Sequence, residues 1–393
     1  MQKNNLTSIK RINPQVLCEY LKKINTDEAG SNIMMKKGEI FSFYITSLSL
    51  PATNILKQEA LSVGGDFATP YECILGKESH YDGVLIATKS QLERIIKKCK
   101  IQPFGLKEIA KSISEHLKHG TSISSENKAS SAIMAIINIT PDSFFAPSRH
   151  STQGCIDKIH YLIDKGISLI DIGAASSRPG SDLIDPQEEI DRIKEIAKYI
   201  KNQNLNQKAI FSIDTYNAST ADFALFHGFK IINDVSGFAD LDMAKIAAKY
   251  GAKVILMHTK GTPKNMQELT DYENLFSHID HFFAEKIEYL KSYGIEDIIL
   301  DIGIGFAKET LDNLALINHL KHFKHFGYPL LVGASRKSVV GAIIDKPPLE
   351  RLNGTLALHL LAFQNGADIL RVHDVDEHID VLKIYQALKS ANV

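Results

Sequence analysis

The stretch KIINDVSGFADLDMAKIAAKYGAKVILMH (residues 230–258) decides the fold class of this chain. Two apolar runs of strand length, 230–235 and 253–258, enclose the segment LDMAKIAAKY (241–250), whose apolar residues recur at helical spacing. Continuous apolar runs, rather than alternating ones, are typical of parallel strands that are buried on both faces. The stretch therefore predicts a strand–helix–strand unit of an α/β protein.

The same rhythm extends from residue 133 to the C-terminus. Segments with helical periodicity, such as DPQEEIDRIKEIAKYI (185–200), separate the apolar runs. The runs of strand length are IMAIINI (133–139), LIDIGA (169–174), AIFSID (209–214), KIINDV (230–235), KVILMH (253–258), IILDIG (298–303), LLVGAS (330–335) and ILRVH (369–373). Eight such strands alternating with helices match a (β/α)₈ TIM barrel, which takes about 250 residues. A doubly wound open sheet shows the same alternation and is the alternative fold.

Polar residues at the strand ends favour the barrel. At or just beyond the C-terminal ends of most predicted strands lie Asn138, Ser176–Arg178, Asp214, Asn233–Asp234, His258, Asp301, Arg371 and His373. A barrel collects all of these ends on one rim, where barrel enzymes carry their active sites. An open sheet would gather only the ends near its switch point. We therefore expect a TIM barrel with its site on that rim.

The composition excludes several classes of protein. Among 393 residues, 45 Lys and Arg balance 46 Asp and Glu, which argues against general binding of nucleic acid or membrane surfaces. No apolar run approaches the roughly 18 residues of a membrane span, and the N-terminus has no apolar signal region. The four cysteines (Cys18, Cys73, Cys99 and Cys155) are scattered without a CxxC pair. We therefore expect a cytoplasmic protein without disulfides or a zinc site.

A polar, Ser-rich stretch, TSISSENKASS (121–131), predicts a linker between two domains, 1–125 and 126–393. The segment before it has two strand-like and two helix-like stretches, with a turn-like GGDFATP (64–70) among them. These are IFSFYI (40–45), NILKQEALSV (54–63), GVLIAT (83–88) and SQLERIIKKC (90–99). They predict a small N-terminal α/β extension. It carries no recognisable catalytic motif, so we expect structural or dimer support rather than a second activity.

Cations at the predicted rim suit an anionic substrate. Arg178, in SSRPG (176–180), and Arg371, in RVHD (371–374), carry guanidinium forks that match phosphate. The stretch GASRKS (333–338) adds Lys337, and free backbone N–H groups near Ser338 at a predicted helix start. Together these groups predict a site for phosphate or carboxylate.

Oxygen-bearing side chains complete the predicted rim. In INITPDSF (137–144), Asn138 and Asp142 offer oxygen ligands to a hard cation. Asp214, Asn233 and Asp301 form a patch of acceptors suited to a donor-bearing, guanidine-like ring edge.

Simpler interpretations exist for single residues. Asp214 precedes TYNAS, so it could instead cap the helix that follows. His258 and His373 lack HxH or HExxH spacing, and we interpret them as rim histidines rather than metal ligands.

Taken together, the motifs resemble those of dihydropteroate synthases, the pterin-binding barrels of folate synthesis. The resemblance covers about residues 133–380 and rests on INITPDSF, DIGAASSRPG, SIDT, IINDVSGF, LMHTKGTPKNMQ, LDIGIGF, VGASRKS and ADILRVHDV, in that order. This family joins 6-hydroxymethyl-7,8-dihydropterin diphosphate to 4-aminobenzoate and releases diphosphate, with Mg²⁺ as cofactor. The resemblance also implies a homodimer and competition of sulfonamides with 4-aminobenzoate.

The resemblance assigns a role to each candidate residue. It implies that the pterin is held by Asp214, Asn233, Met257, Asp301 and Lys337. It implies that the diphosphate is held by Asn138, Arg371 and His373, with Asn138 on Mg²⁺ and Asp142 as a second candidate ligand. It implies that 4-aminobenzoate is held by Ser177, Arg178, Pro179, Phe306 and Ser338. Catalysis then depends on Asn138, Arg178, Lys337, Arg371 and His373.

Departures from the family's common pattern concern loops. Ser177 stands where Thr is usual, and its hydroxyl is retained. Ile302 replaces a frequent Pro and Ala307 a frequent Gly, and both are expected to reshape the loop that carries Phe306.

Two rival functions remain open. A pterin-dependent methyltransferase shares the acidic pterin residues but has no reason to carry SRPG, SRKS and RVHD. A catalytically silent pterin binder would be expected to lack Asn138, Arg178, Lys337 or Arg371, and all four are present. Release of diphosphate that depends on 4-aminobenzoate separates these functions from a synthase.

Overall fold

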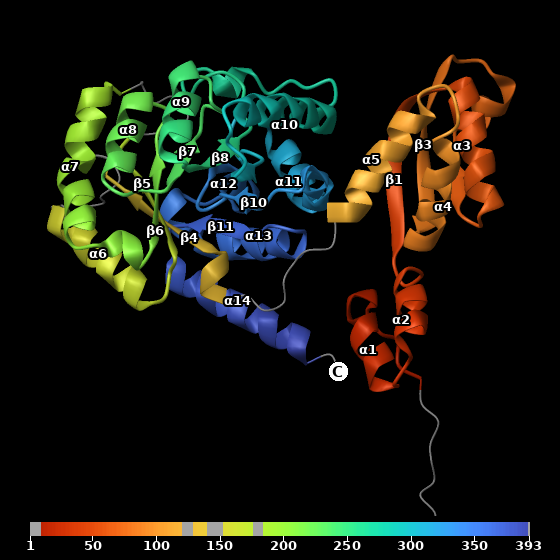
Figure 1. Cartoon of the computed structure of the whole chain (residues 1–393), viewed down its shortest axis with the longest axis horizontal. Helices are drawn as coiled ribbons and strands as arrows, with labels where there is room; N and C mark the ends of the chain where they lie inside the picture. Colours follow the sequence, from red (N-terminus) through yellow and green to blue (C-terminus); the bar gives the residue numbers. More distant parts are fainter. Residues whose placement is uncertain (1–8, 120–128, 140–151, 176–183, 392–393) are drawn as a thin grey trace, which may run out of the picture. The chain divides into compact units, whose positions relative to one another are not determined.

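The computed structural model describes residues 9–119, 129–139, 152–175 and 184–391 (Figure 1). The chain divides into two compact units, one of Met1–Thr121 with Ala387–Val393 and one of Ser122–Gln386. Each unit has a hydrophobic core of its own. Within the described residues, no helix is both long and apolar enough to cross a membrane.

The N-terminal unit is built on a three-stranded antiparallel sheet. Its strands β1 (Ile40–Ser49), β2 (Asp66–Ala68) and β3 (His80–Thr88) lie in the order β1-β3-β2. Its helices are α1 (Leu17–Lys23), α2 (Glu28–Met35), α3 (Leu50–Ser62), α4 (Lys89–Cys99) and α5 (Leu106–His119), with 3-10 turns η1 (Pro14–Val16) and η2 (Tyr71–Leu75). One expectation was wrong: the stretch 64–70 is not only a turn. It forms β2 because Phe67 is fully buried in the core of this unit.

The C-terminal unit is a closed barrel of eight parallel strands. The strands are β4 (Ile133–Asn138), β5 (Leu169–Gly173), β6 (Ile210–Asp214), β7 (Ile231–Asp234), β8 (Lys253–Met257), β9 (Ile298–Asp301), β10 (Leu330–Val332) and β11 (Ile369–Val372). They pair in sequence order, and β11 pairs with β4 to close the ring. The predicted TIM barrel is confirmed, and the open-sheet alternative is wrong.

Helices follow the strands around the barrel, as Figure 1 shows for α6 to α9 beside β5 to β7. They are α6 (Thr152–Asp164), α7 (Pro186–Asn202), α8 (Ala218–Phe226), α9 (Leu241–Tyr250), α10 (Leu275–Ser292), α11 (Thr310–Asn318), α12 (Ser338–Ile344), α13 (Leu352–Gln364) and α14 (Val375–Ser390). Short 3-10 turns are η3 (Ala129–Ala132), η4 (Leu205–Gln207), η5 (Met266–Glu268), η6 (Leu320–Phe326) and η7 (Pro348–Glu350). Their apolar faces and the outward strand residues form one large core.

The inside of the barrel is layered, and this layering positions the site. An inner apolar cluster of Met134, Ile231, Ile255, Ile299, Leu331 and Ile369 fills the barrel. Side chains alternate along a strand, so the next inward residue is two positions further on. At β7, β8, β9 and β11 these next residues are Asn233, Met257, Asp301 and Arg371. The polar residues of the rim therefore stand above a floor that is apolar except at β5 and β6, where Asp171 and Ser212 lie.

Candidate active site at the carboxyl ends of the barrel strands

Four predicted site residues lie on neighbouring strands in direct register. Asp214 of β6 lies opposite Asn233 of β7, and Met257 of β8 lies opposite Asp301 of β9. All four side chains are buried. The structure therefore brings together the acceptor patch that the sequence predicts, with Met257 as an apolar surface within it.

Arg371 ties this patch to β11. Its Nε donates to Oδ2 of Asp171 at 2.7 Å, and its Nη2 donates to Oδ2 of Asp214 at 2.5 Å. Burial raises the pKa of Asp214, while the positive charge of Arg371 opposes that rise. The interpretation of Asp214 as a helix cap is wrong, because the N-cap position of α8 is occupied by Asn217. Asp214 instead holds a guanidinium at the mouth of the barrel.

Asp171 is a site residue that sequence reasoning missed. It lies in the middle of β5 and is fully buried. Its Oδ2 also accepts a hydrogen bond from Nδ2 of Asn233 at 3.0 Å. A usable signal was present, since a carboxylate inside the apolar run LIDIG is buried only where it finds partners.

Asp301 lies at the start of a tight turn after β9. Its Oδ1 accepts from the backbone N–H of Gly303 at 2.8 Å. Burial raises its pKa, and Lys337 opposes that rise. Gly303 has a φ of 67°, and a Cβ there would lie 2.0 Å from the carbonyl oxygen of His258, so only glycine fits. Asp301 is thus held by its own backbone turn.

The loop after that turn carries Phe306 and is organised by Lys308. The buried Nζ of Lys308 donates to the carbonyl oxygens of Gly303 at 3.1 Å and Phe306 at 3.0 Å, and lies 2.9 Å from Nδ1 of His258. Burial lowers the pKa of Lys308 to about 7. Ala307 adopts a φ of 49°, a left-handed conformation that glycine would enter without strain. This loop is therefore ordered by a buried amine.

Lys337 lies between this loop and the acceptor patch. Its Nζ donates to the carbonyl oxygen of Ile304 at 2.6 Å and lies 4.5 Å from the centre of the Phe306 ring. Burial lowers the pKa of Lys337 to about 8, while Asp301 and Asp214 oppose that change. The next residue, Ser338, is exposed at the start of α12 and lines a hollow with Gln267 and the start of α11.

His373 is held in place by two neighbours. Its Nδ1 lies 2.9 Å from Oγ of Ser335, and its Nε2 lies 3.4 Å from Nδ2 of Asn138. Burial, together with the charge of Arg371, lowers the pKa of His373 to about 3. His373 is therefore a neutral hydrogen-bonding group at neutral pH, not a cation.

The chemistry of Asn138 is compatible with a magnesium ion that arrives with a phosphate. Its amide nitrogen faces His373, which leaves its carbonyl oxygen as a ligand. Mg²⁺ keeps several waters and usually takes few protein ligands beside substrate phosphates. Asp142 lies outside the described residues, as do Ser177, Arg178 and Pro179, which are predicted to hold 4-aminobenzoate.

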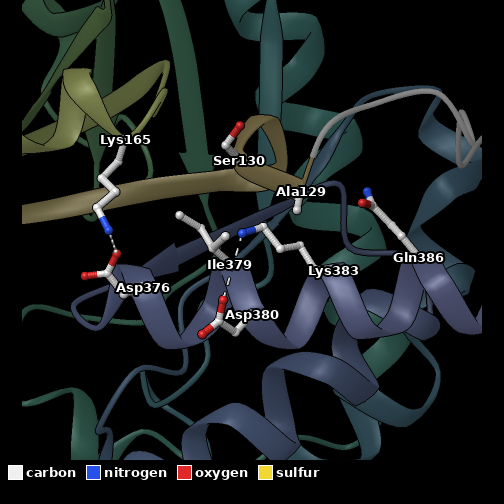
Figure 2. Close-up of a pocket in the computed structure, with 8 residues that line it drawn as sticks. All are labelled: Ala129, Ser130, Lys165, Asp376, Ile379, Asp380, Lys383 and Gln386. Carbon is white, nitrogen blue, oxygen red and sulfur yellow. Dashed lines mark ion pairs between the residues drawn. The ribbon is translucent and has the colours of Figure 1, made fainter.

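Phe306 and Met257 belong to one apolar cluster at the rim, completed by Val235, Met266 and Ala307. This cluster offers a flat ring an apolar surface beside the buried acceptors. A hollow at the other end of the strands, beside η3 and α14, has a different character (Figure 2). Its charges pair with one another, Lys165 with Asp376 at 2.9 Å and Lys383 with Asp380 at 4.0 Å.

Buried acceptors, cations and an apolar surface at the mouth of a parallel barrel are the features of a pterin-binding enzyme, and the family described as "Pterin binding enzyme" matches residues 134–373. A Helicobacter pylori protein named bifunctional dihydropteroate synthase/dihydropteroate reductase is 54% identical, over 98% of this chain and 100% of the relative. The dihydropteroate synthase of Synechocystis is 41% identical, over 65% of this chain and 89% of the relative. The chain belongs to the dihydropteroate synthase family.

Solved structures agree with this assignment. The dihydropteroate synthase of Yersinia pestis, described with a sulfonamide drug complex, has a TM-score of 0.62 and 37% identity, over 66% of this chain and 94% of that chain. The enzyme of Xanthomonas albilineans with 4-aminobenzoic acid has a TM-score of 0.61 and 32% identity, over 66% of this chain and 94% of that chain.

Proposed function

We propose that this chain is a transferase that condenses 6-hydroxymethyl-7,8-dihydropterin diphosphate with 4-aminobenzoate to 7,8-dihydropteroate and diphosphate. The observation that carries the proposal is the register of Asp214 with Asn233 and of Met257 with Asp301 at the mouth of the barrel. Three buried acceptors beside an apolar surface suit a flat ring with several N–H donors.

The pterin would lie against Met257 and donate to the carboxylates and the amide. Among the residues that the structure describes, only Oδ1 of Asp301 is engaged, by Gly303, so the carboxylate can accept from the ring N–H and the exocyclic amine. Lys337 lies close enough to these acids to influence their pKa values and would donate to a ring acceptor.

The diphosphate would lie toward β4 and β11, where Asn138, Arg371 and His373 gather. Arg371 has N–H groups left over after its two bonds to carboxylates, since a guanidinium carries five. Neutral His373 would accept from the amide nitrogen of Asn138 through Nε2 and so direct the carbonyl oxygen of Asn138 toward the diphosphate and its metal. We infer that Asn138 holds Mg²⁺, which supplies positive charge to the departing diphosphate when it is bound.

The 4-aminobenzoate would lie between Phe306 and the start of α12, with its carboxylate near Ser338. Ser177, Arg178 and Pro179 would complete this pocket. The reaction breaks the bond between the pterin methylene carbon and the diphosphate oxygen, and the aniline nitrogen forms the new bond and loses a proton. The residues act by holding the amine near the carbon and by neutralising the leaving anion, with no covalent enzyme intermediate.

A coupled assay of diphosphate release tests this function. We expect release from the pterin diphosphate only when 4-aminobenzoate is present, with dihydropteroate formed in equal amount. Chelation of divalent cations should abolish turnover, and Mg²⁺ should restore it. Sulfonamides should compete with 4-aminobenzoate and not with the pterin. Release without 4-aminobenzoate, or none with both substrates, would contradict the proposal.

A second activity, reduction of dihydropteroate, is a candidate for the same chain. The observation that favours it is the Helicobacter pylori relative named as bifunctional, whose full length is matched, the N-terminal unit included. This differs from our expectation of structural or dimer support for residues 1–125. Reduction needs an external electron donor, so the test offers chemically reduced flavin and follows the conversion of dihydropteroate. Comparing the full chain with the fragment 126–393, which we propose as the synthase domain, assigns each activity to a unit.

We also propose a homodimer in the cytoplasm. All four cysteines are free, which suits a reducing compartment. Light scattering on the purified chain tests the dimer, and a monomer at micromolar concentration would contradict it. Cell fractionation with an antibody tests the compartment.

A further inference from the structure

Asp171 touches two residues that the proposed function uses for two different parts of the substrate. A single oxygen, Oδ2, accepts from Nδ2 of Asn233 at 3.0 Å and from Nε of Arg371 at 2.7 Å. Asp171 itself is fully buried and lies one layer below the mouth, so it is not expected to reach the substrate. Its influence would pass through its two partners.

The carboxylate of Asp171 decides which way the amide of Asn233 faces. A carboxylate can only accept hydrogen bonds, so the amide nitrogen must face Asp171. The carbonyl oxygen of Asn233 is then the group left for a ligand, and it is an acceptor. A reversed amide would present N–H groups to a pterin edge that also carries N–H groups. Asp171, one layer below, therefore determines that Asn233 presents its carbonyl oxygen, an acceptor, to the ligand.

Asp171 also fixes the plane of the Arg371 guanidinium. With Nε on Asp171 and Nη2 on Asp214, two edges of the fork are directed into the barrel. The remaining N–H groups, those of Nη1 above all, are left for an anion. One buried carboxylate thus orients a pterin acceptor and a diphosphate donor together.

We propose that Asp171 is a positioning residue that fixes the acceptor sense of Asn233 toward the pterin and the orientation of Arg371 toward the diphosphate. The proposal rests on the proposed function, because it assumes that Asn233 contacts the pterin. The proposal adds Asp171, which lies one layer below the binding residues, to the residues on which binding depends.

Substitutions at Asp171 can separate the effect of its hydrogen bonds from the effect of its charge. In the described structure, Oδ1 of Asp171 has no hydrogen-bond partner. In Asp171→Asn the amide oxygen can therefore keep both bonds while the amide nitrogen takes the place of Oδ1. Asp171→Leu keeps a similar size and removes both bonds. Ser212→Ala is the matched control, since Ser212 lies opposite Asp171 in the register, is buried and has a hydroxyl without a partner in the described structure.

The experiment measures binding of 6-hydroxymethyl-7,8-dihydropterin without its diphosphate, by calorimetry on the full chain. This ligand reports on Asn233 without the anion that Arg371 would hold. We expect Asp171→Leu to weaken binding about 30-fold, because a buried donor loses its partner and the amide is free to reverse. Asp171→Asn should stay within about fivefold of wild type, and Ser212→Ala should be unchanged.

A double-mutant cycle distinguishes the possible failures. In an Asn233→Ala background, Asp171→Leu should weaken pterin binding by no more than about threefold. An equal loss in both backgrounds would overturn the proposal, as would wild-type binding by Asp171→Leu. If Asp171→Leu does not fold, a 30-fold loss in folded Asp171→Asn would overturn it instead. Wild-type binding by Asn233→Ala would contradict the proposed pterin site itself.

Discussion

The ammonium nitrogen of Lys337 lies 4.5 Å from the centre of the Phe306 ring and donates to the carbonyl oxygen of Ile304 at 2.6 Å. Lys337 is predicted to bind the pterin, and Phe306 is predicted to bind 4-aminobenzoate. Their contact joins the exit of β10 to the loop after β9. The two proposed subsites therefore share a wall, as a reaction that joins two substrates requires.

Phe306→Leu tests whether the Phe306 ring belongs to the proposed 4-aminobenzoate subsite. Leucine is apolar but has no ring face for the cation or for the aminobenzoate ring, a loss of about 1 kcal/mol. We expect KM for 4-aminobenzoate to rise about fivefold, with KM for the pterin diphosphate within twofold of wild type. Phe306→Tyr keeps the ring and should behave like wild type in steady-state kinetics. Equal increases in both KM values would show that Phe306 does not belong to one subsite.

Lys308→Met tests the buried amine behind the loop. Burial lowers its pKa from 10.5 to about 7. Between those values the unfolded chain binds a proton that the folded chain does not, so Lys308 makes stability rise with pH in that range. The free energy of unfolding of wild type minus that of Lys308→Met should therefore grow between pH 7 and pH 9.5.

Urea unfolding at constant ionic strength measures this difference. Lys194→Met, at an exposed position of α7, is the control. The difference between its free energy of unfolding and that of wild type should be the same at each pH. If the free energy of unfolding of wild type minus that of Lys308→Met stays constant or decreases as the pH rises, the lowered pKa of Lys308 is contradicted.

Arg336→Lys tests the contact between the two loops that we propose bind anions, the one after β10 and the one after β11. The guanidinium donates through Nε to Oδ2 of Asp374 at 2.9 Å and through Nη2 to Oδ1 at 2.5 Å. Lysine cannot make this two-point contact, and Lys337 and His373 lie next to the two partners in sequence. We expect kcat/KM for the pterin diphosphate to fall about tenfold. Asp374→Ala should add no more than a further twofold to Arg336→Lys, and additive losses would contradict a direct coupling.

The barrel could be predicted from the sequence because each strand carries its own signal. The run KVILMH predicted β8 (Lys253–Met257), and LDMAKIAAKY predicted α9 (Leu241–Tyr250) at its observed bounds. A strand that is buried on both faces has an uninterrupted apolar run, which can be recognised from the local sequence alone. By contrast, β2 has three residues among turn formers, and its burial depends on Phe67 meeting a core assembled from elsewhere.

The site could be predicted only in part, because its contacts join distant segments. Asp301 and Asn233 were visible as polar strand ends. The pairing of Arg371 with Asp171 crosses 200 positions of the sequence, and no local pattern reports it. Lys308 was missed for a similar reason, since its burial depends on carbonyl groups that the loop presents only when folded.

The central claim is that the acceptors at the mouth of the barrel bind the pterin, and Asp301→Asn tests it most directly. Asparagine can still accept from Gly303, so the turn and the fold should persist. Its amide nitrogen would then face the donors of the pterin, a loss of about 3 kcal/mol, or roughly 100-fold. We predict that kcat/KM for the pterin diphosphate falls about 100-fold, chiefly through KM, with an unchanged melting temperature. A folded variant that turns over within about threefold of wild type would show that Asp301 only supports its turn and that the pterin binds elsewhere.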